Sequence, residues 1–282
     1  MSSIAYVTDS KMLEMHRLNA HKTMNFWRLS NKINFSDFKK GDLVFFLSKD
    51  KKHLLKKEKG IVGYGRLKDI HLSSIKSMWN KYKEENGFNT YDEFIEALTK
   101  LSKNNKLPDK ISSFYLENVN FFQAPIYLSE CGMKISNNVE SYIYLKADDV
   151  TLKILEYAKA SPDLWSNSDI SNIEEDELRF KLAIAHKNIG DYKLNEKLSK
   201  RTNRVLKKYI KDNDYEFVPG SNQELFRIIG NKLEILLYND KEVEKRLLIG
   251  QAILYMHYLN DFDISFKFLN DDTNLVSLIN KP

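Results

Sequence analysis

Hydrophobic and polar positions in the first half of the chain follow strand-like and helix-like patterns in turn. Short β-prone apolar runs predict strands at residues 4–7, 41–49, 60–70 and 114–122. After the third run, helical spacing predicts one helix between a Ser cap and Gly87, and a second that opens with the capping box Thr90–Glu93. Residues 1–147 are therefore expected to form a mixed α+β domain.

The second half of the chain shows mainly helical spacing. Residues 148–172 read as a connecting helix followed by a linker rich in Ser, Asn, Asp and Pro. A capping box at Ser171 opens a helix that Gly190 ends. The elements expected beyond it are an amphipathic helix at 193–211, a short helix near 223–229, a strand at 232–238, a helix at 241–259 and a final strand. Residues 173–282 are thus expected to be a helix-rich α/β domain.

The composition is that of a globular protein. The 282 residues are 42% hydrophobic and 12% aromatic, which is enough for packed cores. The N-terminus has no apolar signal segment, and no apolar run is long enough to span a membrane. The single cysteine, Cys131, excludes an intrachain disulfide and a cysteine-based zinc site. A cytoplasmic protein without a membrane partner is expected.

Glycine-spaced residues 60–67, GIVGYGRL, could be mistaken for a phosphate-binding loop. Such a loop needs a strand-to-helix turn and usually ends in Gly-Lys-Ser/Thr, and neither is present. Gly63 and Gly65 are two positions apart, so they lie on one face of a strand and let a neighbouring element approach. The stretch is therefore interpreted as a strand.

Basic residues are concentrated on one side of the helix expected at 193–211. The chain carries 44 Lys and Arg against 39 Asp and Glu, which permits a polyanionic partner without requiring one. The stripe consists of Lys197, Lys200, Arg201, Arg204, Lys207, Lys208 and Lys211. It suits contact with a nucleic-acid backbone. A solvated helix face is the alternative.

Several motifs of the first half occur in a recognisable order. They are NFWRLS, FKKGDLVFFL, KGIVGYGRL, MWNKYKEENGF and SFYLENVNFFQAPIYL. In this order they resemble the EVE/YTH-like N-terminal domain, of the PUA-like superfamily, of bacterial restriction endonucleases. The resemblance implies a twisted β-barrel flanked by helices, with an aromatic pocket that accepts a flipped or modified base.

The resemblance places the base pocket at Trp27, with Arg28 and Ser30 beside it, and less directly at Tyr64, Trp79 and Phe122. Core packing is the alternative for Trp27 and Trp79. The resemblance also implies a restriction system used in antiviral defence. The HNH nuclease motif that ends the better known members is absent, because the chain has only six His and no paired His motif in its second half.

The last part of the chain weakly resembles a degenerate PD-(D/E)xK nuclease. The resemblance implies Asp214, or Glu216, and Glu234 as magnesium ligands, with Gln251 and Tyr255 as a Q-x-x-x-Y helix. Leu236 stands where the catalytic lysine is expected, although Lys232 is nearby. The alternatives are that the domain no longer cuts, or that Gln251 and Tyr255 are ordinary residues of one helix face.

Two functions of different classes follow. One is a DNA-binding defence protein that recognises a modified base in duplex DNA. If it is catalytic, it is an endonuclease that cleaves the DNA with Mg²⁺. It would act as a homodimer or with a partner nuclease. The other is a non-catalytic reader of RNA or DNA, or a subunit that targets a partner enzyme.

Overall fold

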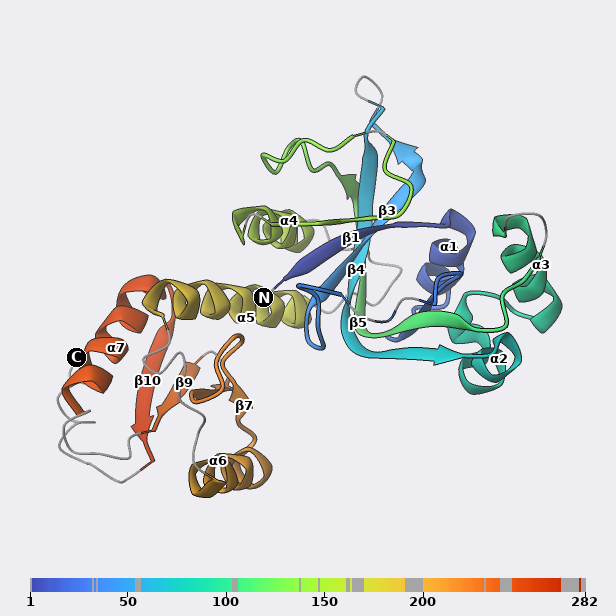
Figure 1. Cartoon of the computed structure of the whole chain (residues 1–282). Coiled ribbons are helices and arrows are strands. Elements are labelled where there is room, and N and C mark those ends of the chain that lie inside the picture. The colour runs from blue at the N-terminus through green and yellow to red at the C-terminus, as the bar shows by residue number, and fades with distance from the viewer. Residues whose placement is uncertain are drawn as a thin grey trace. The chain divides into compact units, whose positions relative to one another are not determined.

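The computed structural model describes residues 2–31, 33, 35–53, 57–102, 106–136, 138–146, 148–160, 163, 170–190, 200–230, 232–238, 245–269 and 279. The chain divides into two compact units, Ser2–Glu177 and Leu178–Pro282 (Figure 1). Both combine helices with a sheet, which confirms the predicted α+β class. The division at Glu177 lies beyond the linker predicted at 148–172.

The N-terminal unit is built on a six-stranded sheet with the order β2-β5-β4-β3-β1-β6. Strand β1, which lies between β3 and the edge strand β6, pairs in parallel with β3, and the other neighbours are antiparallel. The strands are β1 (Ser3–Thr8), β2 (Met24–Arg28), β3 (Leu43–Lys52), β4 (Lys59–Ser73), β5 (Ile111–Ile126) and β6 (Tyr142–Tyr144). The four runs predicted as strands are therefore strands.

Strands β4 and β5 are long and bend strongly, so the sheet curls toward a barrel (Figure 1). Their pairing contains three register shifts, and bulges of this kind bend a sheet. Gly63 lies in the bent region, where a Cβ would come within 2.4 Å of the Asn120 carbonyl oxygen. GIVGYGRL is thus a strand whose glycine lets β5 approach closely, as predicted.

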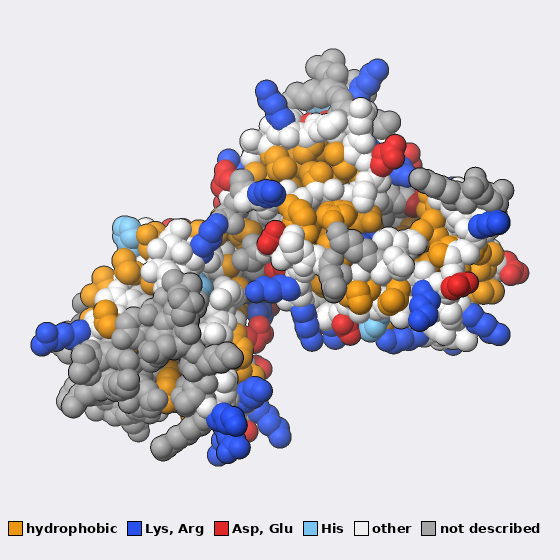
Figure 2. Space-filling view, in the orientation of Figure 1, with side chains coloured by type: hydrophobic (Ala, Val, Ile, Leu, Met, Phe, Trp, Pro, Cys, Tyr) orange, Lys and Arg blue, Asp and Glu red, His pale blue; other side chains and the backbone are white. Residues whose placement is uncertain are grey.

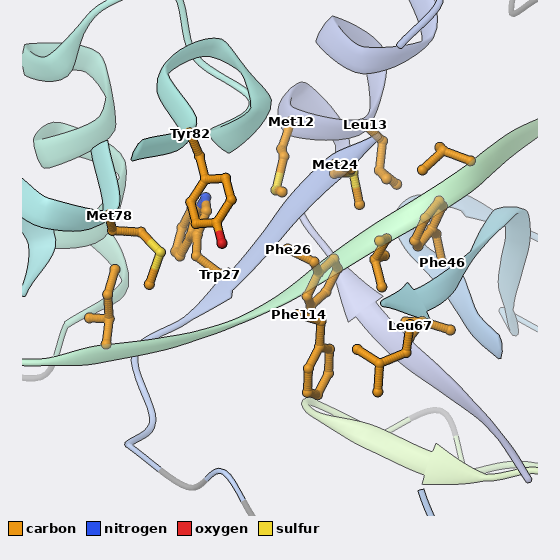
Figure 3. Close-up of a cluster of buried hydrophobic side chains, with 14 of the residues drawn as sticks. Met12, Leu13, Met24, Phe26, Trp27, Phe46, Leu67, Met78, Tyr82 and Phe114 are labelled. Carbon is orange, nitrogen blue, oxygen red and sulfur yellow. The ribbon is translucent and has the colours of Figure 1, made fainter. Parts of the chain in front are cut away.

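Both faces of the sheet are buried. Along β3, Val44 and Phe46 belong to one core, whereas Leu43, Phe45 and Leu47 belong to the other. Helices α1 (Ser10–Leu18), α2 (Ile75–Tyr82) and α3 (Tyr91–Leu101) cover the first core, part of which Figure 3 shows. Helix α4 (Asp148–Ala160) covers the second with Ile154 and Leu155, so the predicted connecting helix belongs to this unit.

Local capping explains why α2 and α3 begin where they do. The Ser74 hydroxyl accepts a hydrogen bond from the backbone N–H of Ser77 at 3.3 Å. The predicted capping box of α3 is present, because Thr90 and Glu93 bond each other's backbone N–H groups. After α2, a short 3₁₀ turn (Lys83–Asn86) ends at Gly87, whose φ of 85° suits glycine.

The C-terminal unit contains a four-stranded sheet with the order β10-β9-β8-β7. Strands β9 and β10 are parallel and are connected through α7, whereas the other pairs are antiparallel. Its elements are α5 (Ile170–Ile189, entering from the N-terminal unit), α6 (Lys200–Asn213), β7 (Glu216–Phe217), β8 (Leu225–Ile229), β9 (Lys232–Leu237), α7 (Lys245–Tyr258) and β10 (Asp263–Phe268).

Two local predictions in this region were wrong. Residues 225–229 form strand β8 instead of a short helix, because Leu225 and Phe226 pair with β9 and are buried on opposite faces of the sheet. Ser171 does not cap α5, since the helix already includes Ile170. Residues 193–199 of the predicted basic helix lie outside the described residues.

No helix in the described part of the chain is long and apolar enough to cross a membrane.

Candidate nucleic-acid interface

Helix α6 presents a row of exposed basic side chains. Positions 200, 204, 207, 208 and 211 recur at helical spacing and share one face. The five residues are Lys200, Arg204, Lys207, Lys208 and Lys211, and all are exposed. Within the described residues none of them forms an ion pair, and Lys and Arg side chains gather over α6 in Figure 2. The predicted Lys197 and the side chain of Arg201 lie outside what the structure describes.

The opposite face of α6 anchors the helix to the sheet. Leu206 is fully buried against Tyr215, Leu225 and Leu236, and Tyr209 packs beside it. The amine of Lys267, on β10, lies 5.6 Å from the centre of the Tyr209 ring. The basic face is therefore held outward by a packed apolar face, which is the arrangement expected of an amphipathic helix.

Glu234, predicted to bind metal, has other partners. Its carboxylate accepts hydrogen bonds from the Tyr215 hydroxyl and from Arg227 Nε, the latter at 2.7 Å. Burial raises the pKa of the Glu234 carboxyl, but these two bonds outweigh it and hold the pKa below its usual value. The predicted Asp214 is exposed in the turn after α6, with φ of 56°. The described residues contain no cluster of three His, Cys, Asp or Glu suited to a metal.

Gln251 and Tyr255 lie on the other side of the sheet from Glu234. Along β9, Leu233 and Ile235 belong to the same core as Tyr255, whereas Glu234 alternates with them and faces Tyr215. The structure therefore does not bring Glu234 and Gln251 together.

Gln251 and Tyr255 converge on a different carboxylate, that of Glu224. Both donate hydrogen bonds to it, and His186 Nδ1 lies 3.0 Å from Glu224 Oε2 and 3.1 Å from the Tyr255 hydroxyl. Glu224, His186 and Tyr255 are at most 5% exposed. Sequence reasoning found the spacing of Gln251 and Tyr255 but missed Glu224 and His186, which nothing in the periodicity marks. The cluster connects α5 and α7 with the residue directly before β8.

Trp27 is a core residue of the N-terminal unit. It is 7% exposed, its ring centre lies 5.5 Å from that of Phe94, and its Nε1 donates to the Asn86 carbonyl at 2.9 Å. Figure 3 shows it among the side chains of this core. Trp79 is partly buried and stacks on the same Phe94 at 5.7 Å. Tyr64 and Phe122 belong to the core on the opposite face of the sheet, so the six predicted pocket residues do not line one pocket.

Arg28 is buried among aromatic rings. Its guanidinium carbon lies 4.3 Å from the centre of Phe114 and 4.9 Å from that of Phe35. Arg28 Nη2 donates to Ser112 Oγ at 2.8 Å, and Ser112 Oγ donates to the Ser30 carbonyl at 2.6 Å. Burial lowers the pKa of Arg28. The chain thus places Arg28 and Ser30, two of the predicted residues, in one hydrogen-bonded group.

Two surface cavities of the N-terminal unit contain predicted residues. One, of about 510 Å³, is lined by Leu29, Ser30, Asn31, Leu72, Pro108, Asp109 and Lys110. The other, of about 410 Å³, is lined by Phe122, Ala124, Pro125, Ile126, Glu130 and Tyr157. The first combines apolar walls with a hydroxyl, an amide and two charged groups, as ligand pockets commonly do. Sequence reasoning pointed to Ser30 but missed Asn31, Asp109 and Lys110.

Comparisons with known proteins found little. No family model and no curated protein matches the chain. Among solved structures, the crystal structure of ASCH from Zymomonas mobilis is similar, with 12% identity, a TM-score of 0.39, and coverage of 55% of this chain and 94% of that chain. Two single-residue mutants of that protein match with 12% and 14% identity, a TM-score of 0.38, and coverage of 55% of this chain and 98% and 95% of theirs. Similarity at this level carries no function to this chain.

Proposed function

We propose that this protein binds nucleic acid and that the basic face of α6 contacts the phosphate backbone. The observation that carries the proposal is the row of five exposed cations at helical spacing, fixed outward by the buried face of the same helix. Side chains so arranged can each approach a phosphate and release a condensed counterion. Among the described residues these exposed cations have no carboxylate partner, so they are available for that contact.

The N-terminal unit is proposed as the part that reads the target, as an EVE/YTH-like, PUA-like domain of a restriction or defence system would. The target is duplex DNA with a modified base. The cavity beside Ser30 supports this role, because it offers apolar walls and the polar groups of Asn31, Asp109 and Lys110. Trp27 is already packed in the core, so base contact through it would require the core to rearrange.

A reader without nuclease activity is the second candidate. The ion pair of Glu234 with Arg227 favours it, because a carboxylate engaged in this way is a poor ligand for Mg²⁺. Cleavage of plasmid DNA with Mg²⁺, lost in Glu234→Gln, would decide for the nuclease instead.

The proposed backbone contact has a measurable dependence on salt. If all five cations contact phosphates of a duplex, affinity falls roughly 500-fold between 50 and 200 mM salt. Fluorescence anisotropy with a labelled duplex gives the slope of log K against log salt. Lys207→Glu/Lys208→Glu should reduce the slope by about 1.8. The matched control is Lys134→Glu/Lys146→Glu, which makes the same change in charge at exposed sites of the N-terminal unit. A shallow slope, or equal losses in both variants, contradicts the proposal.

Base reading is tested separately. We expect a duplex with modified cytosine, or with another modified base from a panel, to bind more tightly than the plain duplex. Asn31→Trp, which fills the cavity beside Ser30, should remove this preference and leave the salt dependence unchanged. Equal affinity for all modified and plain duplexes would contradict base reading without affecting the proposal for α6.

A further inference from the structure

Strand β5 bulges out of its pairing with β4 near its C-terminal end. Residues 121–126 of β5 pair with only residues 61–63 of β4, which leaves three extra residues on β5. Pro125 lies in this bulge, where the regular ladder of hydrogen bonds is interrupted and a residue without an N–H is tolerated. Bulges occur often beside functional sites, because they turn side chains out of the regular sheet.

The bulge borders the cavity of about 410 Å³, named here the bulge cavity, which is lined by Phe122, Ala124, Pro125, Ile126, Glu130 and Tyr157. Its volume is typical of small-molecule sites, which measure roughly 300–1,000 Å³. Phe122 is buried, whereas Tyr157 of α4 is 46% exposed. Ile154, one turn before Tyr157, packs in the same core as Phe122 and so fixes α4 beside the bulge. The cavity therefore has two aromatic rings in its lining.

The charge of the bulge cavity is negative. Among the described residues that line it, Glu130 alone is charged. The Glu130 carboxylate accepts a hydrogen bond from the backbone N–H of Tyr127 at 3.4 Å, and no described Lys or Arg forms an ion pair with it. Lys153, one turn before Tyr157 on α4, is paired with Asp149 at 3.3 Å. The cavity thus carries negative charge in a chain whose net charge is +5.

Neighbouring groups respond to this negative charge. Burial, followed by the Glu130 carboxylate, raises the pKa of the Cys131 thiol to about 11, although Lys153 acts in the opposite direction. Burial and then Glu130 also raise the pKa of the Tyr127 phenol. At this turn the influence of Glu130 therefore exceeds that of Lys153.

We propose that the bulge cavity binds a small organic cation, in which an ammonium group is carried on an aromatic or alkyl body. The ammonium group lies beside the Glu130 carboxylate and the Tyr157 ring, both of which attract a cation. The apolar body packs on Phe122 and Pro125. An anionic ligand such as a phosphate is disfavoured by the same carboxylate, so this site is separate from the nucleic-acid contact proposed for α6.

Titration of the full chain by NMR tests the proposal with three probes of similar size and different charge. The probes are 2-phenylethylammonium, 2-phenylethanol and 3-phenylpropionate. The backbone amide signals of Ala124 and Glu130 should shift and saturate with the ammonium probe in the millimolar range. Its affinity should be about three- to thirtyfold higher than that of the alcohol, and the carboxylate probe should bind most weakly.

Two substitutions separate the charge from the ring. Glu130→Gln keeps an acceptor for the Tyr127 N–H, and Tyr157→Leu keeps an apolar wall. Each should reduce the preference for ammonium over alcohol by about two- to fivefold. The matched controls are Glu84→Gln, at an exposed position of the same unit, and Tyr258→Leu, at a position 43% exposed on α7. Both controls should bind the probes like wild type.

Ala124→Trp, at an exposed position of the lining, should fill the bulge cavity and abolish binding. Circular dichroism checks that each variant is folded. Equal affinities for the three probes overturn the proposal, as does the absence of saturation with the ammonium probe. A preference for ammonium that survives both Glu130→Gln and Tyr157→Leu would overturn it too.

Discussion

Protonation of His16 should destabilise the N-terminal unit as the pH falls. His16 lies in α1 with no exposed surface, and its Nδ1 is 3.0 Å from His21 Nδ1. Burial, with a further contribution from the nearby His21, lowers the pKa of His16 from 6.5 to about 3. The unfolded chain therefore binds a proton at mildly acid pH that the folded chain excludes. Stability conferred by the neutral ring is complete above pH 6.5 and is lost as the pH falls toward 3.

The magnitude follows from the two pKa values. Relative to neutral pH, proton binding by His16 in the unfolded chain should lower the unfolding free energy by about 1.4 kcal/mol at pH 5.5 and by about 2.7 kcal/mol at pH 4.5. Burial also raises the pKa of Asp42 to about 6, which gives the opposite slope below that pH. Asp42 is common to wild type and variant, so its contribution cancels in their difference.

Urea unfolding followed by tryptophan fluorescence measures this difference, because all three tryptophans lie between residues 2 and 177. The free energy of wild type minus that of His16→Gln should fall by about 1.4 kcal/mol between pH 7.5 and 5.5. The control Leu13→Ala removes a buried group of the same helix that does not titrate, so its difference from wild type should be independent of pH. A flat difference for His16→Gln would refute the reasoning.

Two further substitutions test contacts in the two units. Gly63→Ala places a methyl group against the Asn120 carbonyl. It should lower the unfolding free energy of the N-terminal unit by about 1–3 kcal/mol in the same urea assay. The control Gly41→Ala measures backbone strain alone, because a Cβ there meets no atom although φ is 92°. Tyr255→Phe removes a hydrogen-bond donor to the buried Glu224 carboxylate. It should lower the unfolding free energy, measured by circular dichroism, by about 1–3 kcal/mol, whereas Tyr258→Phe, at a half-exposed position, should change it little. Equal effects of the two substitutions would contradict the role of the Tyr255 hydrogen bond.

Local signals in the sequence were sufficient where the chemistry is local. Thr90 and Glu93 are three residues apart and cap the same turn, so their pairing is visible without a fold. The consecutive apolar residues Val44, Phe45 and Phe46 indicated a strand, and the structure explains them by a core on each face.

Sequence reasoning failed where the answer depends on distant partners. Trp27 is a core residue because Asn86, far along the chain, accepts its N–H, and no pattern around Trp27 indicates that. Glu234 and Gln251 have the spacing that a PD-(D/E)xK nuclease would require. However, the face of the C-terminal sheet on which Glu234 lies depends on the alternation of side chains along β9 relative to α7. A single position in register would have moved Glu234 to the side of Gln251.

The position of β1 between two strands that follow it in the sequence affects how the chain folds during its synthesis. Residues 3–8 pair with residues 43–48 on one side and, through Ile4–Tyr6, with Tyr142–Tyr144 on the other. Strand β1 therefore waits for one of its neighbours until residue 144 has emerged from the ribosome, a delay on the order of ten seconds at usual elongation rates. Until then, one edge of an apolar strand stays open to pairing with other chains. Slow elongation beyond residue 50 should therefore increase the demand for chaperones in this protein.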